Sequence, residues 1–198
     1  MEMKLPTPEQ LTRAYEIDMK AAFPPAELKP LWNIEAMCRD GCYRPWCLFD
    51  GEELVGECFL WLGKPGWALL DYLCVSARRR NGGLGALILS ELIKTEAGTV
   101  ILGECESPVH AEDPAMAERR LGFYARNQAR MAGYDTELFG VHYKTLYWAP
   151  VPVSDEELIR QHQFIYQNRF PPDKYEQFIR IPRDPAAEPS PLSPWNED

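Results

Sequence analysis

The sequence predicts a mixed α/β fold in which helices flank a sheet. Short apolar segments with strand patterns alternate with amphipathic helical segments. One apolar strand, at 67–75, leads through a glycine-rich loop into an apolar helix at 84–94. The chain has 198 residues, which suits one compact domain. We therefore predict a single domain over 1–181, followed by a flexible tail at 182–198 that is rich in proline and acidic residues.

Two amphipathic helices are predicted near the start of the chain, over residues 8–22 and 27–39. Residues 23–25, Phe-Pro-Pro, separate them because consecutive prolines interrupt a helix. The first residues have neither the basic nor the apolar segment of an export signal. The chain also lacks an apolar stretch long enough to span a membrane. These features predict a cytoplasmic protein that does not interact with membranes.

A hairpin and a third strand are predicted next. Asp50-Gly51 is a strong hairpin signal between apolar segments at 45–50 and 51–62. The segment 67–75 is apolar on both faces, which is typical of a central strand.

The second half of the chain alternates between strands and helices. The predicted elements are a strand at 99–106, a helix at 113–127, two strands within 133–148 that turn around Phe139-Gly140, and a helix at 154–170. Asp113 followed by proline marks one helix start, and Ser154 with Glu157 forms a capping box at the other. The aromatic residues within 143–181 either cover the domain's own core or pair two subunits, so a homodimer stays open.

Charge and cysteine content limit the classes of partner. The net charge of −9 argues against a nucleic-acid partner. It suits solubility, and it also suits a site that attracts cationic amines. The six cysteines are predicted to be reduced thiols in a chain without an export signal. Their spacing is not of the CxxC type, so no metal site is expected.

The stretch "ARRRNGGLGALIL" at 77–89 places three arginines and three glycines between a strand and a helix. Backbone N–H groups and the helix dipole attract anions at such a helix start. Glycines let a phosphate approach these amides, and arginines add bidentate donors. The stretch therefore predicts a pyrophosphate site, with a basic surface turn as the plainer alternative.

A dinucleotide-binding loop is a second alternative for this stretch. Gly83-Leu84-Gly85 matches part of the GxGxxG pattern, and the acidic residues at 104 and 106 lie about 20 residues further on. The third glycine position is Ile88, however. A nucleotide-dependent oxidoreductase therefore remains an alternative function.

The loop and its flanks resemble a known family. Residues 80–85, "RNGGLG", match the pattern R/Q-x-x-G-x-G/A of the GNAT superfamily of N-acetyltransferases. "YLCVSARRRNGGLGALIL" resembles that family's central strand, pyrophosphate loop and following helix, and the resemblance extends over about residues 10–150. It implies a mixed, mostly antiparallel sheet that is splayed between its fourth and fifth strands, at 67–75 and 99–106.

The resemblance also implies acetyl-CoA as co-substrate, with no metal. The backbone of residues 73–75 would bind the pantetheine arm, and the amides of 80–86 the pyrophosphate. The implied cofactor-binding residues are Leu73, Cys74, Val75, Arg80, Asn81, Gly82, Gly83, Leu84, Gly85 and Ala86.

Three residues are candidates for catalysis. An ammonium must lose a proton before it can accept an acetyl group, so a base is needed. Glu104 and Glu106 stand at the end of one strand, where alternation predicts a shared face. Glu104 is favoured as the base. The alternatives are that the two glutamates bind a cationic substrate, or that they are simply solvated acids at a strand end. Tyr124 in "RRLGFYARN" occupies the family's general-acid position, with core packing as its alternative.

Two features near these residues bear on the resemblance. The family's motif continues toward Gly-Phe, whereas this chain has Gln128-Ala129, which puts the position of Tyr124 in doubt. Phe23, Trp32 and Trp61 are candidates for lining the pocket that holds the acceptor, although core packing explains each of them alone.

The predicted function is direct acetyl transfer to a primary amine of a small, cationic acceptor in a ternary complex. A non-catalytic acyl-CoA sensor is a further alternative.

Overall fold

The computed structural model describes residues 1–25, 27–80 and 82–191, which form two compact units. Of these residues, the first unit comprises those within 1–62 and 70–97, and the second comprises 63–69 and 98–191. No helix in the described part of the chain is long and apolar enough to cross a membrane. The single domain over 1–181 and the flexible tail stay predictions.

The first unit contains a sheet in the order β1-β2-β3-β4. Its strands are β1 (Glu2–Lys4), β2 (Tyr43–Asp50), β3 (Glu53–Leu62) and β4 (Trp67–Val75), whose first residues belong to the second unit. The β1–β2 and β2–β3 pairs are antiparallel. The predicted hairpin is confirmed: Gly51 turns the chain with a φ of +63°. The three-residue β1 was not predicted, because so short a strand has no readable pattern.

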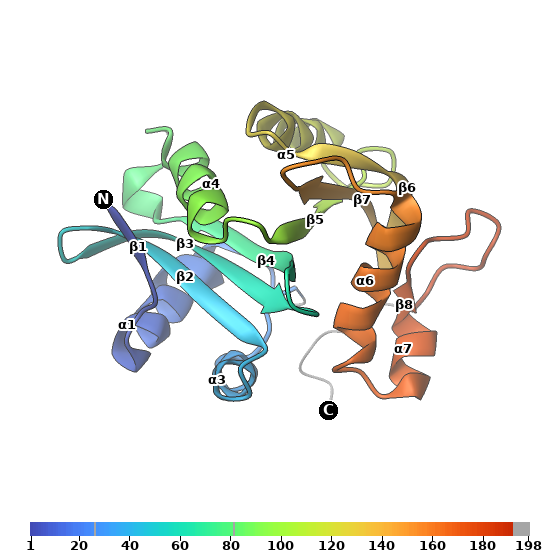
Figure 1. Ribbon diagram of the computed structural model, residues 1–198, viewed down its shortest axis with the longest axis horizontal. Helices are drawn as coiled ribbons and strands as arrows, with labels where there is room; N and C mark the ends of the chain where they lie inside the picture. Colours follow the sequence, from blue (N-terminus) through green and yellow to red (C-terminus); the bar gives the residue numbers. More distant parts are fainter. Residues whose placement is uncertain (26, 81, 192–198) are drawn as a thin grey trace. The chain divides into compact units, whose positions relative to one another are not determined.

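Helices cover both faces of this sheet (Figure 1). On one face lies α4 (Leu84–Thr95), so close that a methyl group at Gly56 would collide with the Ile88 side chain. On the other lie α3 (Leu31–Arg39) and the predicted first helix. This first helix has three parts, namely α1 (Pro8–Arg13), a π-helical stretch η1 (Ala14–Met19) and α2 (Lys20–Ala22).

The predicted helix at 27–39 starts later than expected, at Leu31. The Tyr72 hydroxyl accepts a hydrogen bond from the Lys29 N–H at 2.8 Å and donates one to the Glu27 carbonyl at 2.8 Å. These bonds hold the backbone of residues 27–29 against β4 in a non-helical conformation. Pro30 then sits at the N-cap of α3.

The second unit contains an antiparallel sheet in the order β5-β7-β6-β8. Its strands are β5 (Val100–Glu106), β6 (Arg130–Leu138), β7 (Val141–Trp148) and the two-residue β8 (Ile179–Arg180). The predicted turn between β6 and β7 is confirmed, with Phe139 and Gly140 at φ values of 51° and 79°.

Three helices accompany this sheet: α5 (Pro114–Arg126), α6 (Asp155–Gln167) and α7 (Pro172–Phe178). The first two begin at their predicted N-caps, but only the Ser154 half of the predicted capping box is formed, since Glu157 Oε1 accepts from Gln161 Nε2 instead. Asp113 Oδ1 accepts from the Met116 N–H at 3.0 Å, and Ser154 Oγ accepts from the Glu157 N–H at 3.3 Å. The short helix α7 was not predicted. It begins directly after Pro171, at a second proline, which suits the first position of a helix.

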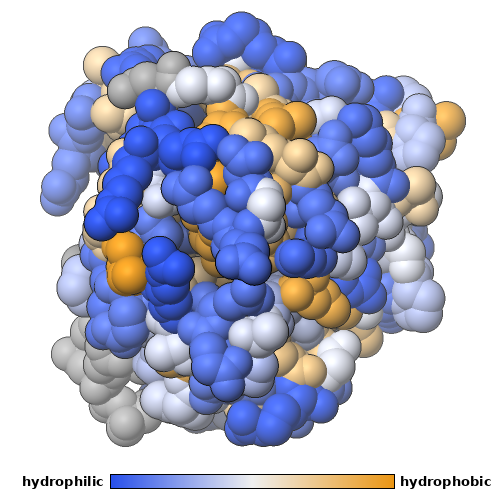
Figure 2. Space-filling model, turned by 90° about the vertical axis from the view of Figure 1, so that its left-hand side faces the viewer, coloured by the Kyte–Doolittle hydropathy of each residue, from blue (hydrophilic) through white to orange (hydrophobic). Residues whose placement is uncertain are grey.

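The side of the molecule that carries the β2–β3 hairpin and the start of α4 is mostly hydrophilic (Figure 2). Hydrophobic side chains appear on this side only as small, separate patches.

The core of the first unit contains an unusual acidic residue. Glu57 on β3 is fully buried, and neither carboxyl oxygen has a hydrogen-bond partner of regular geometry among the residues that the structure describes. Burial raises the pKa of Glu57 to about 8, and the nearby Asp18 carboxylate adds to the rise. Glu57 is therefore mostly protonated at neutral pH. Because its pKa in the unfolded chain is near the ordinary value of 4.5, the stability of the folded state falls as the pH rises from that value to about 8.

Replacing Glu57 with glutamine should remove this loss of stability. We expect Glu57→Gln to match the parent near pH 4.5 and to be more stable at pH 8 by on the order of 4 kcal/mol. Urea unfolding at the two pH values measures the difference. Glu53→Gln on the same strand is the control, since that side chain is half exposed and pairs with Arg79. A gain from Glu57→Gln of equal size at both pH values would contradict this interpretation.

Candidate active site

The loop before α4 presents free backbone donors. Gly83 forms the N-cap of α4 with a φ of +75°, a conformation that favours glycine. The N–H groups of Ala86 and Leu87 donate to the Gly83 carbonyl, at 3.1 and 3.2 Å. The N–H groups of Leu84 and Gly85 therefore remain without an acceptor inside the helix. Gly82 and Gly83 are exposed, and Asn81 lies outside the described residues.

The three arginines of this loop have different environments. Arg79 pairs with Glu53 at 2.6 Å and with Asp50 at 2.9 Å, so its charge is largely neutralised. Arg80 is exposed, and its Nε donates to the Val75 carbonyl at 3.4 Å. Arg78 forms no ion pair with any residue that the structure describes.

The predicted pantetheine strand lies at the end of β4. Leu73 and Val75 are half-buried, and Cys74 is buried. Burial raises the pKa of the Cys74 thiol well above its usual value, so this thiol is not a nucleophile. All six cysteines are free thiols.

Glu104 on β5 is held by two side chains of α6. His162 Nε2 lies 2.8 Å from Glu104 Oε1, and the Tyr166 hydroxyl donates to the two carboxylate oxygens at 3.1 and 3.0 Å. The Tyr134 hydroxyl lies 3.1 Å from His162 Nδ1. A neutral imidazole with its proton on Nε2 satisfies this whole pattern, since it donates to Glu104 and accepts from Tyr134.

Glu106 and Glu104 have different partners. Glu106 Oε2 lies 3.9 Å from Arg120 Nη1 of α5, whereas Glu104 is bound from α6. The two carboxylates share a strand end, and among the described residues they have no hydrogen-bond or ion-pair partner in common. Within the described ranges, hydrogen bonds fix the orientation of Glu104 but not that of Glu106.

Tyr124 lies on α5, with its ring edge-on to Trp148 at a centroid distance of 5.7 Å. Burial raises the pKa of Tyr124 to about 12, so its hydroxyl keeps its proton at neutral pH. Helix α5 ends two residues later, and Gln128 adopts a φ of 69°. This left-handed conformation is the one that glycine favours at a helix end. The chain therefore leaves α5 through a left-handed residue that is not a glycine.

Sequence reasoning missed His162 and Tyr134 as site residues, and it placed Tyr166 only among the aromatic residues. His162 and Tyr166 are four positions apart on one helix, a spacing that predicts a shared face. The sequence gives no sign that Glu104, 58 residues before His162, lies opposite that face. His162 is fully buried, and Glu104 retains 14% side-chain exposure.

The predicted acceptor-wall aromatics differ in environment. Trp32 is 68% exposed, whereas Trp61 is fully buried. The Lys29 Nζ lies 4.9 Å from the Trp61 ring centroid and 2.8 Å from Asp71 of β4. Phe23 packs edge-on against Tyr72 at 5.0 Å. Trp61 therefore borders a buried lysine–aspartate pair, whereas Phe23 packs on the neighbouring Tyr72.

The loop residues fit the diphosphate of acetyl-CoA. Free amides at the start of a twelve-residue helix, exposed glycines and the exposed Arg80 form the donor set that a diphosphate requires. The described residues contain no group of three or more His, Cys, Asp or Glu side chains that could hold a metal ion. The antiparallel pairing within both units differs from the parallel sheet of a dinucleotide-binding fold.

Comparisons with known proteins agree on one family. Residues 11–123 match the model of the acetyltransferase (GNAT) family. The protein YjbC of Bacillus subtilis (strain 168), named as an acetyltransferase, is 29% identical over 153 residues, which cover 74% of this chain and 76% of that protein.

Two solved structures show the fold. A GNAT-family acetyltransferase from Bacteroides thetaiotaomicron matches with a TM-score of 0.68 and 20% identity, over 82% of this chain and 95% of that one. An aminoglycoside 6'-N-acetyltransferase in complex with coenzyme A matches with a TM-score of 0.60 and 16% identity, over 78% of this chain and 100% of that one.

The predicted fold class, a mixed α/β fold with a mostly antiparallel sheet flanked by helices, is confirmed. The predicted co-substrate is confirmed as well, because GNAT acetyltransferases use acetyl-CoA. The family model spans more than half of the sequence and includes the glycine loop. This chain therefore belongs to the GNAT family and is an acetyl-CoA-dependent acetyltransferase.

Proposed function

We propose that this acetyltransferase acts on a primary amine of a small, cationic acceptor, by direct transfer in a ternary complex in the cytoplasm. The orientation of Glu104 is the observation that carries the proposal. Its carboxylate is held at the end of β5 by His162 and Tyr166 and keeps some exposure. A carboxylate in this setting can attract an ammonium group and take its proton.

The chain's own groups have defined roles in this proposal. Acetyl-CoA supplies an activated thioester and a thiolate leaving group. The amides of Leu84 and Gly85, with Arg80, hold its diphosphate. Glu104 accepts the ammonium proton, directly or through water, while His162 and Tyr166 act as positioning residues. Tyr124 keeps its proton at neutral pH and is the proposed donor to the departing thiolate.

The net charge of −9 supports a cationic acceptor, since an acidic protein attracts cations over long range. The aminoglycoside acetyltransferase of similar fold acts on such an acceptor. A non-catalytic acyl-CoA sensor would keep the loop but would not need an oriented carboxylate.

The first test concerns the glycine loop. Gly83→Ala places a side chain at a φ of +75°, and the backbone shift that relieves this strain should weaken acetyl-CoA binding roughly ten-fold. Gly98→Ala is a matched control, because Gly98 has a φ of +88° and also nothing within 4 Å of an added Cβ. Both variants should lose similar stability, and calorimetry should show weaker acetyl-CoA binding only for Gly83→Ala. Equal affinity of the two variants would exclude this loop as the diphosphate site.

The second test separates the two glutamates. We expect Glu104→Gln to lower kcat by about 10²- to 10⁴-fold, because the general base is lost, while acetyl-CoA affinity stays unchanged. Glu106→Gln, two positions along the same strand, should retain most activity. The assay uses a panel of primary amines that includes polyamines and aminoglycosides. A parent protein without turnover on any of them would favour the sensor, and a larger effect of Glu106→Gln would make that residue the base.

The third test concerns Tyr124. Tyr124→Phe keeps the ring that packs against Trp148 and removes only the hydroxyl. If the hydroxyl protonates the thiolate, kcat should fall by about 10²-fold or more at unchanged stability and acetyl-CoA affinity. Tyr175→Phe on α7 is the control, since burial raises the pKa of that tyrosine as well. Full activity of Tyr124→Phe would assign this residue to packing alone.

A further inference from the structure

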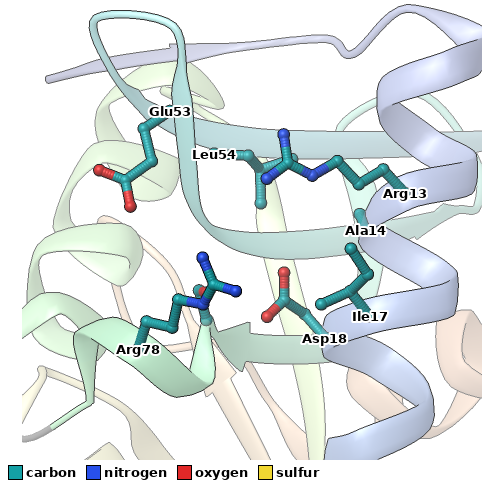
Figure 3. A pocket seen from close by; sticks show the side chains of 8 residues that line it. Arg13, Ala14, Ile17, Asp18, Glu53, Leu54 and Arg78 are labelled. Atoms are coloured by element: carbon teal, nitrogen blue, oxygen red, sulfur yellow. The ribbon is translucent and has the colours of Figure 1, made fainter.

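A pocket of mixed charge lies in the first unit, between the first helix and the ends of β3 and β4 (Figure 3). It opens to solvent, and its volume is about 440 Å³ when this open space is counted, so only a small ligand fits. Arg13, Ile17 and Asp18 line it from the helix, Leu54 from β3, and Arg78 from the loop after β4. The roles assigned above to the loop amides, Glu104 and Tyr124 do not use this pocket.

Asp18 is the negative group of the pocket. Its side chain is only 7% exposed, and its Oδ1 has no hydrogen-bond partner among the described residues. The carboxylate points into the pocket (Figure 3). A buried acceptor without a donor is costly, so a donor from a ligand would be favourable here. Glu57, whose pKa the nearby Asp18 carboxylate helps to raise, adds no positive charge to the pocket, because a carboxyl group is either neutral or negative.

Arg13 and Arg78 are the positive groups. Their guanidinium groups extend toward the same space as the Asp18 carboxylate (Figure 3). Neither arginine forms an ion pair with another residue in the described part of the chain, in contrast to the neighbouring Arg79, which binds Glu53 and Asp50. Glu53 borders the pocket, but its charge is balanced by Arg79.

Apolar side chains complete the lining. Ile17 is 55% exposed, which is unusual for so large an aliphatic group, and it lines the pocket opposite the charged groups of the β4 loop. Leu54 adds a second aliphatic surface. Covering these two side chains would remove apolar area from water.

We propose that this pocket binds an α-amino acid with an aliphatic side chain. Its ammonium group would bind Asp18, its carboxylate Arg13 and Arg78, and its side chain would cover Ile17 and Leu54. A simple cation is opposed by two guanidinium groups, and a simple anion by Asp18. A zwitterion satisfies both signs of charge. This site is independent of the acetyl-transfer proposal.

The ligand test compares three molecules of one shape. We expect L-leucine to bind the full-length protein in calorimetry. L-leucinamide, which lacks the carboxylate, and 4-methylpentanoate, which lacks the ammonium group, should bind at least about ten-fold more weakly, since each loses charge-assisted hydrogen bonds. Absence of binding by L-leucine at tens of millimolar would overturn the proposal. Binding of either analogue as tight as that of L-leucine would overturn it too.

The variant test assigns the contacts. Asp18→Asn and Arg78→Gln should each weaken L-leucine binding at least about ten-fold. Glu53→Gln is the matched control at the pocket's edge and should bind as the parent does. Acetyl-CoA affinity and thermal unfolding report whether each variant is folded. Parent-like L-leucine affinity in a folded Asp18→Asn variant would contradict the site, and if that variant fails to fold, Arg78→Gln decides in the same way.

Discussion

The hydrogen bonds between Glu104 and helix α6 are the interaction on which the candidate chemistry of the second unit depends. A strand end leaves a carboxylate free to rotate, and His162 and Tyr166 remove that freedom. His162 is in turn oriented by Tyr134 on β6, so β5, β6 and α6 together hold one side chain. A fully buried imidazole in such a position is satisfied at both nitrogens, which lets it sit in the core at low cost.

Much of the fold was predictable from the sequence, because turns and caps are local. Asp50-Gly51, Asp113-Pro114 and the Phe139-Gly140 turn each marked a boundary correctly. The predicted start of α3 was wrong because the interaction that delays this helix is not local. Tyr72, more than 40 residues further on, binds the backbone at Glu27 and Lys29. The short strands β1 and β8 depend on pairing with distant partners and leave no pattern of their own.

In the candidate site, too, the local features were predictable from the sequence and the non-local ones were not. The glycine loop was predicted because its chemistry lies within a few consecutive residues, whereas the partners of Glu104 come from a helix more than 50 residues later. Composition also misleads about charge. Three consecutive arginines suggest three equivalent cations, yet their environments differ. Arg79 is neutralised by Asp50 and Glu53. Arg80 donates a hydrogen bond to the Val75 carbonyl, and Arg78 lines a separate pocket.

The contacts of β4 with residues 27–29 have a consequence for how such an enzyme can change. Asp71 and Tyr72 hold the segment that leads into α3, and the same strand continues directly to Leu73–Val75, where the donor's arm is expected to bind. Substitutions at Asp71 or Tyr72 that reshape this segment therefore also disturb the part of β4 that is expected to lie beside acetyl-CoA. Divergence toward new acceptors is easier at positions that contact neither Asp71 nor Tyr72, and Trp32, which is exposed on α3, is one of them.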